Sequence, residues 1–168
     1  MRKFIVGVMG AGAGATSEDL RRALELGERI ARQGWVLLSG GRNAGVMQEV
    51  NRGAKQVEGS LTIGILPNAR ATVSEFVDVV IITDLGNARN NINVLSSDVV
   101  VACGTGGAGT LSEIALAIKA GKPVILLGSD DADKAFIQRL SKDKVFTAET
   151  PEQVMQLIIE HLHFWHSD

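Results

Sequence analysis

A glycine-rich turn in the second half of the chain carries the clearest potential for chemistry. Residues 104–110 read Gly-Thr-Gly-Gly-Ala-Gly-Thr, follow an apolar run at residues 99–103, and precede a segment of helical periodicity that includes Glu113. Glycines let backbone N–H groups converge on one point, and the start of a helix adds unpaired N–H donors and the positive end of the helix dipole. A strand, a glycine turn and a helix start in this order predict a binding site for an anion such as a phosphate.

Two similar turns occur nearer the N-terminus. Residues 10–14 follow the apolar run 4–9, and residues 39–45 follow the apolar run 36–38. Each turn leaves a predicted strand and enters a predicted helix. One such turn alone is weak evidence, whereas three predict several phosphate-binding edges on the same side of a sheet.

Apolar runs without alternation are separated along the chain by segments with helical periodicity. Such runs indicate the strands of a parallel sheet that is covered on both faces. The predicted strands are residues 4–9, 35–38, 61–66, 76–82, 98–102, 124–127 and 144–146, and the predicted helices are residues 17–32, 45–56, 88–95, 111–120, 132–141 and 151–164. We therefore expect a doubly wound α/β fold in a single domain, residues 1–168, that binds its ligand at the carboxyl ends of the strands near the topological switch point.

The bulk composition excludes several classes of function. The 168 residues carry a formal net charge of −2, which argues against a protein that coats nucleic acid. No apolar stretch approaches the roughly 20 residues that span a bilayer, and the single cysteine, Cys103, permits no internal disulfide. His161, His163 and His166 lack the spacing of a helical metal pair, so no metal ion bound directly by the protein is expected. These features predict a cytoplasmic protein without nucleic-acid or membrane partners.

Three arginines fall in loops or helix starts on the predicted ligand edge: Arg42, Arg70 and Arg89. A guanidinium there can bind a phosphate through two parallel hydrogen bonds, and the alternative for each is a solvated surface position. Arg70 belongs to residues 68–75, which have no periodicity. We interpret this segment either as a loop that closes over a ligand or as a solvated connector.

The first turn fits a dinucleotide fingerprint only in part. Gly10, Gly12 and Ala15 occupy its three small-residue positions, but the carboxylate expected at the end of the second strand is absent at Ser39. Arg42 could face a 2′-phosphate instead, which keeps an NADP-binding module as an alternative. No lysine of the P-loop type follows any glycine turn, so hydrolysis of nucleoside triphosphates is not expected.

Glu113 permits two interpretations. It stands three residues after Thr110, which is the spacing of a capping box in which Thr110 caps the helix. Alternatively, its carboxylate lies inside the anion pocket and binds ligand hydroxyl or amino groups, or supports acid–base chemistry. Cys103 is interpreted as a small buried residue, with contact between its thiolate and a ligand metal as the alternative.

Two motifs resemble the signatures of a known superfamily. They are Ser39-Gly40-Gly41 with Gly45-Val46-Met47, and Gly-Gly-Ala-Gly-Thr-Leu-Ser-Glu at residues 106–113. Both are similar to motifs of the Lonely Guy phosphoribohydrolases and of the molybdenum cofactor carrier proteins, which share a Rossmann-like fold. The resemblance covers nearly the whole chain.

In the hydrolase branch, an arginine before the fifth strand and the glutamate of Pro-Gly-Gly-x-Gly-Thr-x-x-Glu cleave nucleoside 5′-monophosphates to a base and ribose 5-phosphate. The resemblance implies Arg89 and Glu113 as those catalytic residues. In this chain Thr105 replaces the proline of the motif, the turn is one residue longer, and Asn90-Asn91 stands where the hydrolases carry a lysine. The glycine turn and the later Ala-Gly-Lys-Pro-Val segment look more like the carrier branch.

Resemblance to the carrier branch implies a protein that binds, protects and stores or transfers molybdenum cofactor without catalysis, with molybdoenzymes as acceptors. The cofactor is a pterin with a terminal phosphate and an anionic molybdenum dithiolene group, which suits glycine turns that bind anions. Because members of the superfamily are usually dimers or tetramers, a homodimer or homotetramer is expected, and Phe164 and Trp165 offer apolar surface for a partner. The residues expected to bind the cofactor are Gly10, Gly12, Ala13, Gly40, Gly41, Arg42, Asn43, Arg89, Gly104, Thr105, Gly106, Gly107, Ala108, Gly109, Thr110 and Glu113.

Overall fold

Seven parallel strands form one sheet at the centre of the molecule. The computed structural model describes residues 2–141 and 143–165, and only the backbone of residues 163–165, so the predicted contact of Phe164 and Trp165 with a partner lies outside the described side chains. The strands are β1 (Ile5–Gly10), β2 (Val36–Ser39), β3 (Leu61–Leu66), β4 (Val79–Ile82), β5 (Val99–Cys103), β6 (Val124–Leu127) and β7 (Val145–Ala148). Their order, β4-β3-β2-β1-β5-β6-β7, confirms the predicted doubly wound α/β fold.

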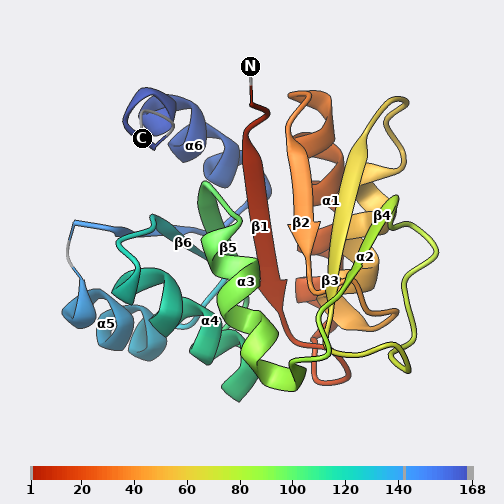
Figure 1. Cartoon of the computed structure of the whole chain (residues 1–168). Helices are drawn as coiled ribbons and strands as arrows, with labels where there is room; N and C mark the ends of the chain where they lie inside the picture. The colour runs from red at the N-terminus through yellow and green to blue at the C-terminus, as the bar shows by residue number, and fades with distance from the viewer. Residues whose placement is uncertain (1, 142, 166–168) are drawn as a thin grey trace.

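Helices cover both faces of this sheet (Figure 1). They are α1 (Ser17–Arg32), α2 (Gly45–Ala54), α3 (Arg89–Leu95), α4 (Ala108–Lys119), α5 (Asp131–Leu140) and α6 (Pro151–Trp165), and the 3₁₀ helix η1 (Gly86–Ala88) precedes α3. One core packs α1, α2 and α6 against one face, with Leu26, Val50 and Ile158 among its buried residues. The second core packs α3, α4 and α5 against the other face, with Val94 and Ile114 at its centre. Within residues 2–141 and 143–165, no helix combines the length and the apolar character needed to cross a membrane.

The direction in which the chain crosses the sheet reverses between β1 and β5. From β1 the chain proceeds through β2 and β3 to β4 on one side, whereas β5 is followed by β6 and β7 on the other. Gly10, the last residue of β1, pairs with Cys103, the last residue of β5, so the two carboxyl ends meet. Because α1 packs on one face and α4 on the other, the chain diverges here and leaves a crevice, which is where doubly wound sheets bind ligands.

The start of α1 and its contact with α2 fix the helices behind this crevice. Thr16 caps α1 in a capping box, with its hydroxyl accepting the Asp19 N–H at 3.1 Å and the Asp19 carboxylate accepting the Thr16 N–H at 3.1 Å. The two helices cross at two glycines. A Cβ on Gly27 would lie 2.0 Å from the carbonyl oxygen of Val50, and one on Gly53 would lie 1.9 Å from that of Leu24. Only glycine allows this close approach of the two backbones.

β4 is shorter than the apolar run 76–82 predicts. Residues 76–78 do not pair with β3, because side chains replace the ladder bonds there. The Asp78 carboxylate accepts the N–H of Thr62 at 2.9 Å, and the Thr62 hydroxyl donates to the Phe76 carbonyl at 2.8 Å. α4 begins at Ala108, three residues before its predicted start, and the remaining boundaries agree with the prediction within two residues.

Candidate functional site

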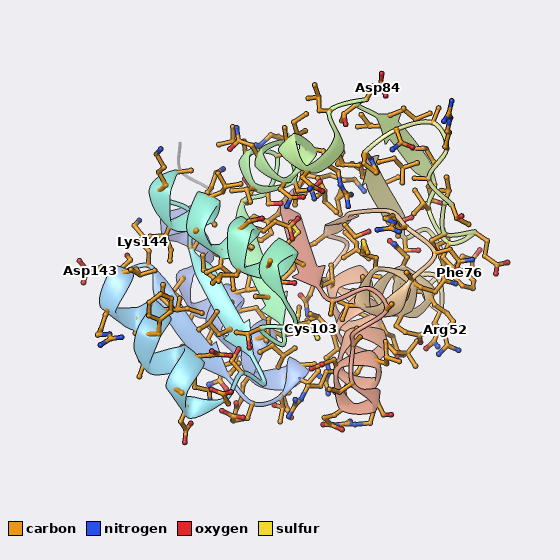
Figure 2. All side chains as sticks on the ribbon, turned by 90° about the horizontal axis from the view of Figure 1, so that it is seen from below. Arg52, Phe76, Asp84, Cys103, Asp143 and Lys144 are labelled. Atoms are coloured by element: carbon orange, nitrogen blue, oxygen red, sulfur yellow. The ribbon has the colours of Figure 1, made fainter. Side chains whose placement is uncertain are left out.

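A cavity of about 240 Å³ lies at the switch point, where β1 and β5 end. Figure 2 views the molecule from this edge of the sheet, with Cys103 at the end of β5 near the centre. Main-chain glycines, two arginines, two asparagines and one carboxylate meet in the cavity. The lining residues are Val8, Met9, Gly10, Ala11, Gly12, Gly40, Arg42, Met47, Asn87, Arg89, Asn90, Gly106, Gly107, Ala108, Gly109, Thr110 and Glu113.

Most of the residues predicted to bind a ligand line this cavity, and five do not. The five are Ala13, Gly41, Asn43, Gly104 and Thr105. The sequence prediction also missed six lining residues: Val8, Met9, Ala11, Met47, Asn87 and Asn90. Asn87 and Asn90 flank Arg89 in a segment rich in amides, which is a signal that the sequence does carry.

The N-terminus of α4 supplies free N–H donors to the cavity. Gly107, with φ of 120°, is the N-cap, and no side chain caps the helix. The first helical hydrogen bond runs from the Leu111 N–H to the Gly107 carbonyl at 3.0 Å. The N–H groups of Ala108, Gly109 and Thr110 precede that bond, have no acceptor among the described residues, and lie where a helix binds anions.

The turn at residues 39–45 is divided between two roles, because Gly40 and Arg42 line the cavity whereas Gly41 and Asn43 do not. Its N–H groups are largely used within the protein: Asn43 donates to the Thr72 carbonyl at 2.9 Å, and Gly41 donates to the Ser39 hydroxyl at 3.1 Å. Gly41 has φ of 68°, and a Cβ there would lie 2.7 Å from the Cα of Gly64. Gly41 and Asn43 therefore fix the turn against β3 and residues 68–75, rather than line the cavity.

Residues 68–75 do not cover the cavity. Ser74 donates to the Gly41 carbonyl at 2.9 Å, and Val73 forms an isolated antiparallel bridge with Arg42. Arg70 is exposed and is not among the residues that line the cavity. The segment thus holds the turn that carries Arg42 without lining the cavity, and its closure over a ligand stays a prediction.

Gly104 and Thr105 face α1 and α5. A Cβ on Gly104 would lie 2.8 Å from the carboxylate of Asp19, and its φ is 69°. The hydroxyl of Thr105 donates to the carboxylate of Asp133 at the start of α5. These two residues shape the first half of the glycine turn, while its second half lines the cavity.

Arg89 is held rigidly at the cavity wall. Its Nη1 donates to the carbonyl oxygen of Gly40 at 2.6 Å and to that of Ile65, so one side chain joins the ends of β2 and β3 to α3. A Cβ on Gly40 would lie 2.7 Å from this nitrogen, which explains why glycine stands there. Burial lowers the pKa of Arg89, Glu113 opposes that shift, and Arg42 adds to it. A second cation near Arg89 indicates that this part of the cavity is suited to an anion.

Glu113 is a buried carboxylate in the cavity and not part of a capping box. Thr110 and Glu113 both lie inside α4, so the capping interpretation is wrong. The Oε1 atom of Glu113 accepts a hydrogen bond from Asn93 Nδ2 at 2.8 Å. Burial raises the pKa of Glu113, while the Asn93 hydrogen bond and the charge of Arg89 oppose the rise. Arg89 and Glu113 share the cavity, but no ion pair within 4.0 Å joins them in the described part of the chain.

The single thiol belongs to the core and not to the cavity. Burial, reinforced by Asp19, raises the pKa of Cys103 to about 12, and its Sγ donates to the Asp19 carbonyl at 3.4 Å. A protonated, buried thiol is a poor metal ligand. In the described part of the chain, no group of three His, Cys, Asp or Glu side chains could hold a metal ion, and His166 and the side chain of His163 lie outside that part.

Solved structures of similar proteins match nearly the whole chain. The molybdenum cofactor binding protein of Rippkaea orientalis is 56% identical with a TM-score of 0.91, and 96% of this chain and 99% of that one are covered. The molybdenum cofactor carrier protein of Chlamydomonas reinhardtii is 44% identical with a TM-score of 0.90, over 96% and 99% of the two chains.

A more distant relative comes from the hydrolase branch. The cytokinin riboside 5′-monophosphate phosphoribohydrolase of Mycobacterium tuberculosis is 32% identical over 114 residues, which cover 66% of this chain and 60% of the hydrolase. The family model of the SLOG cluster4 family (LDcluster4) matches residues 3–155. Since this match spans most of the sequence and the fold agrees with it, the chain belongs to the SLOG cluster4 family.

Proposed function

We propose that this protein binds molybdenum cofactor in the cavity at the switch point, and protects and stores or transfers it without catalysis. The observation that carries the proposal is the similarity, over 96% of this chain, to a protein that binds molybdenum cofactor. The cavity supports it, because free N–H donors of α4 and the guanidinium groups of Arg42 and Arg89 surround one space.

The donor groups fit a ligand with two anionic ends. The N–H groups at residues 108–110 suit a phosphate or an oxo group, and Arg42 and Arg89 suit the other anion. Val8, Met9 and Met47 add apolar wall on which a pterin ring can pack.

A protection experiment tests this function. Isolated cofactor is exposed to air with and without the protein, and the intact fraction is followed over time by mass spectrometry. We expect an equimolar amount of protein to slow the loss of cofactor severalfold. An equal rate of loss with and without protein contradicts the proposal.

A phosphoribohydrolase is the second candidate, because Arg89 and Glu113 share the cavity and the Mycobacterium tuberculosis relative is a hydrolase. This candidate predicts release of adenine from adenosine monophosphate by the wild type, lowered about a hundredfold or more in Glu113→Gln. We expect no release above background. Robust release that is lost in both Arg89→Ala and Glu113→Gln would establish the hydrolase instead.

We also propose that residues 1–168 act as one ligand-binding domain, that the protein is cytoplasmic, and that it forms a homodimer or homotetramer. A reducing location suits the free thiol of Cys103.

All four residues of the edge strand β4 are exposed by 42 to 53%, and Leu85, Leu95 and Leu111 add further exposed apolar surface. A second copy of the chain would cover such surface. Molybdoenzymes are the expected acceptors of the cofactor.

A further inference from the structure

A carboxylate inside an anion-binding cavity requires an explanation. Among the described residues that line the cavity, Glu113 is the only one with an acidic side chain, and Arg42 and Arg89 are the cations. An ionised carboxylate repels a phosphate or an oxo anion, and the repulsion is stronger in a cavity of low dielectric than in water. Glu113 is therefore suited to a part of the ligand that carries hydrogen-bond donors.

The position of Glu113 separates it from the anion donors. It lies three to five residues beyond the free N–H groups of residues 108–110, which at 1.5 Å per residue corresponds to about 4 to 8 Å along α4. One ligand can therefore place an anion at the start of α4 and a ring beside Glu113.

The carboxylate is held in place and keeps capacity to accept hydrogen bonds. Asn93 is fully buried, and its amide fixes Oε1 of Glu113 at 2.8 Å. Oε2 has no hydrogen-bond partner among the described residues, and Glu113 lines the cavity. An ionised carboxylate offers about four acceptor sites, of which Asn93 uses one.

We propose that Glu113 selects the ring of the ligand by accepting hydrogen bonds from the adjacent N–H groups of a 2-aminopyrimidin-4-one edge. Such an edge presents an exocyclic amino group beside a ring N–H, and two parallel donors match the two oxygens of a carboxylate. Pterins carry this edge, and guanine carries it too. Adenine lacks it, because an acceptor nitrogen stands beside its amino group. Selection of a pterin rests on the proposed function, because molybdenum cofactor contains one. A guanine nucleotide presents the same edge and is the alternative ligand.

Two pairs of probes test the proposal directly. 6-Hydroxymethylpterin is compared with 6-hydroxymethyllumazine, and guanosine monophosphate with inosine monophosphate; in each pair the second compound lacks the 2-amino group. Equilibrium titrations of the wild type should show about ten- to hundredfold tighter binding of the 2-amino member of at least one pair. A preference confined to the first pair identifies pterin as the source, and one confined to the second identifies guanine.

Variants show whether Glu113 causes the preference. Glu113→Gln should bring the affinity ratio of the preferred pair close to unity, because an amide presents only one acceptor oxygen. The control Glu49→Gln makes the same change beside Arg52 on α2, outside the cavity, and should leave the ratio unchanged. A ratio that persists in Glu113→Gln contradicts the proposal, and so does failure of the 2-amino member of both pairs to bind the wild type.

Titration of the same proteins with molybdenum cofactor separates the two proposals. If Glu113 selects the ring but the cofactor does not bind, the proposed function is wrong and the inference survives for another ligand with the same edge. If the cofactor binds and Glu113→Gln keeps the 2-amino preference, the function stands and the inference is wrong.

Discussion

Gly107 is the residue at which we expect a single substitution to affect binding separately from folding. Its φ of 120° disfavours any side chain, but a Cβ there would meet no atom within 4 Å. Gly107→Asp and Gly107→Asn therefore share a similar backbone strain of about 1 to 3 kcal/mol, because φ of 120° and ψ of 176° lie in a region that is essentially restricted to glycine. Only Asp places a negative charge beside the free N–H groups of α4, so we expect it to weaken cofactor binding about a hundredfold relative to Asn.

The two Gly107 variants are compared by anaerobic titration and by thermal unfolding. Equal melting temperatures with unequal affinities support an anion site at this turn. If Gly107→Asp binds the cofactor as tightly as Gly107→Asn does, the anion does not bind at this turn.

Glu113 should make the stability of the ligand-free protein depend on pH. Burial raises its pKa in the folded state above the ordinary value of 4.5, so the folded protein binds this proton more tightly than the unfolded chain. The associated stability is fully present below pH 4.5 and is lost as the pH rises through the folded-state pKa. Glu113→Gln does not titrate, so we expect it to gain stability relative to the wild type as the pH rises from 4.5 to neutrality.

Chemical unfolding of both proteins across that pH range measures the effect. A stability difference that does not change with pH would show that ionised Glu113 causes no strain in the cavity. If instead the wild type becomes more stable relative to Glu113→Gln as the pH rises, the effect has the opposite sign, which would indicate that ionised Glu113 forms a stabilising ion pair.

At the level of secondary-structure elements, continuous apolar runs predicted the strands, because a parallel sheet buries both faces of each strand, and apolar periodicity predicted the helices that cover it. The glycine turns predicted where the cavity lies, but not which glycines line it. Gly41 and Gly104 have positive φ and pack against the protein, whereas Gly107 opens on the cavity. These roles depend on contacts between segments distant in sequence, such as Gly41 with Gly64 in β3, and no local pattern encodes them.

The contact between α1 and α2 is a second feature that periodicity does not predict. In the sequence Gly27 fits the apolar face of α1. In the structure it allows the Val50 carbonyl of α2 to come close, because a Cβ on Gly27 would lie 2.0 Å from that oxygen. Alanine in a helix is favoured over glycine by about 1 kcal/mol, but the clash outweighs that gain. We expect Gly27→Ala to lower the free energy of unfolding by about 1 to 3 kcal/mol.

Gly14→Ala is the matched control, because a Cβ on Gly14 would meet nothing within 4 Å. Urea unfolding should show little change for this variant. If Gly27→Ala is as stable as the control, the two helices can separate without loss and the crossing is not a constraint on the fold.

At the scale of the whole molecule, one sheet edge is left with exposed apolar residues that the ligand site does not use. Val80 and Ile82 in β4 are exposed by 42% and 53%. We expect light scattering to report a dimer or tetramer for the wild type at micromolar concentration, and the double variant Val80→Lys, Ile82→Lys to report a smaller species. A monomeric wild type would contradict the proposed assembly, and an unchanged mass of the variant would place the interface elsewhere.

The central claim is that the cavity where β1 and β5 end holds molybdenum cofactor. Anaerobic titration of the wild type with purified cofactor tests it most directly. We predict saturable binding at about one equivalent per chain, because one cavity combines the helix donors with both arginines. Absence of saturable cofactor binding, together with tight binding of adenosine monophosphate, would contradict it.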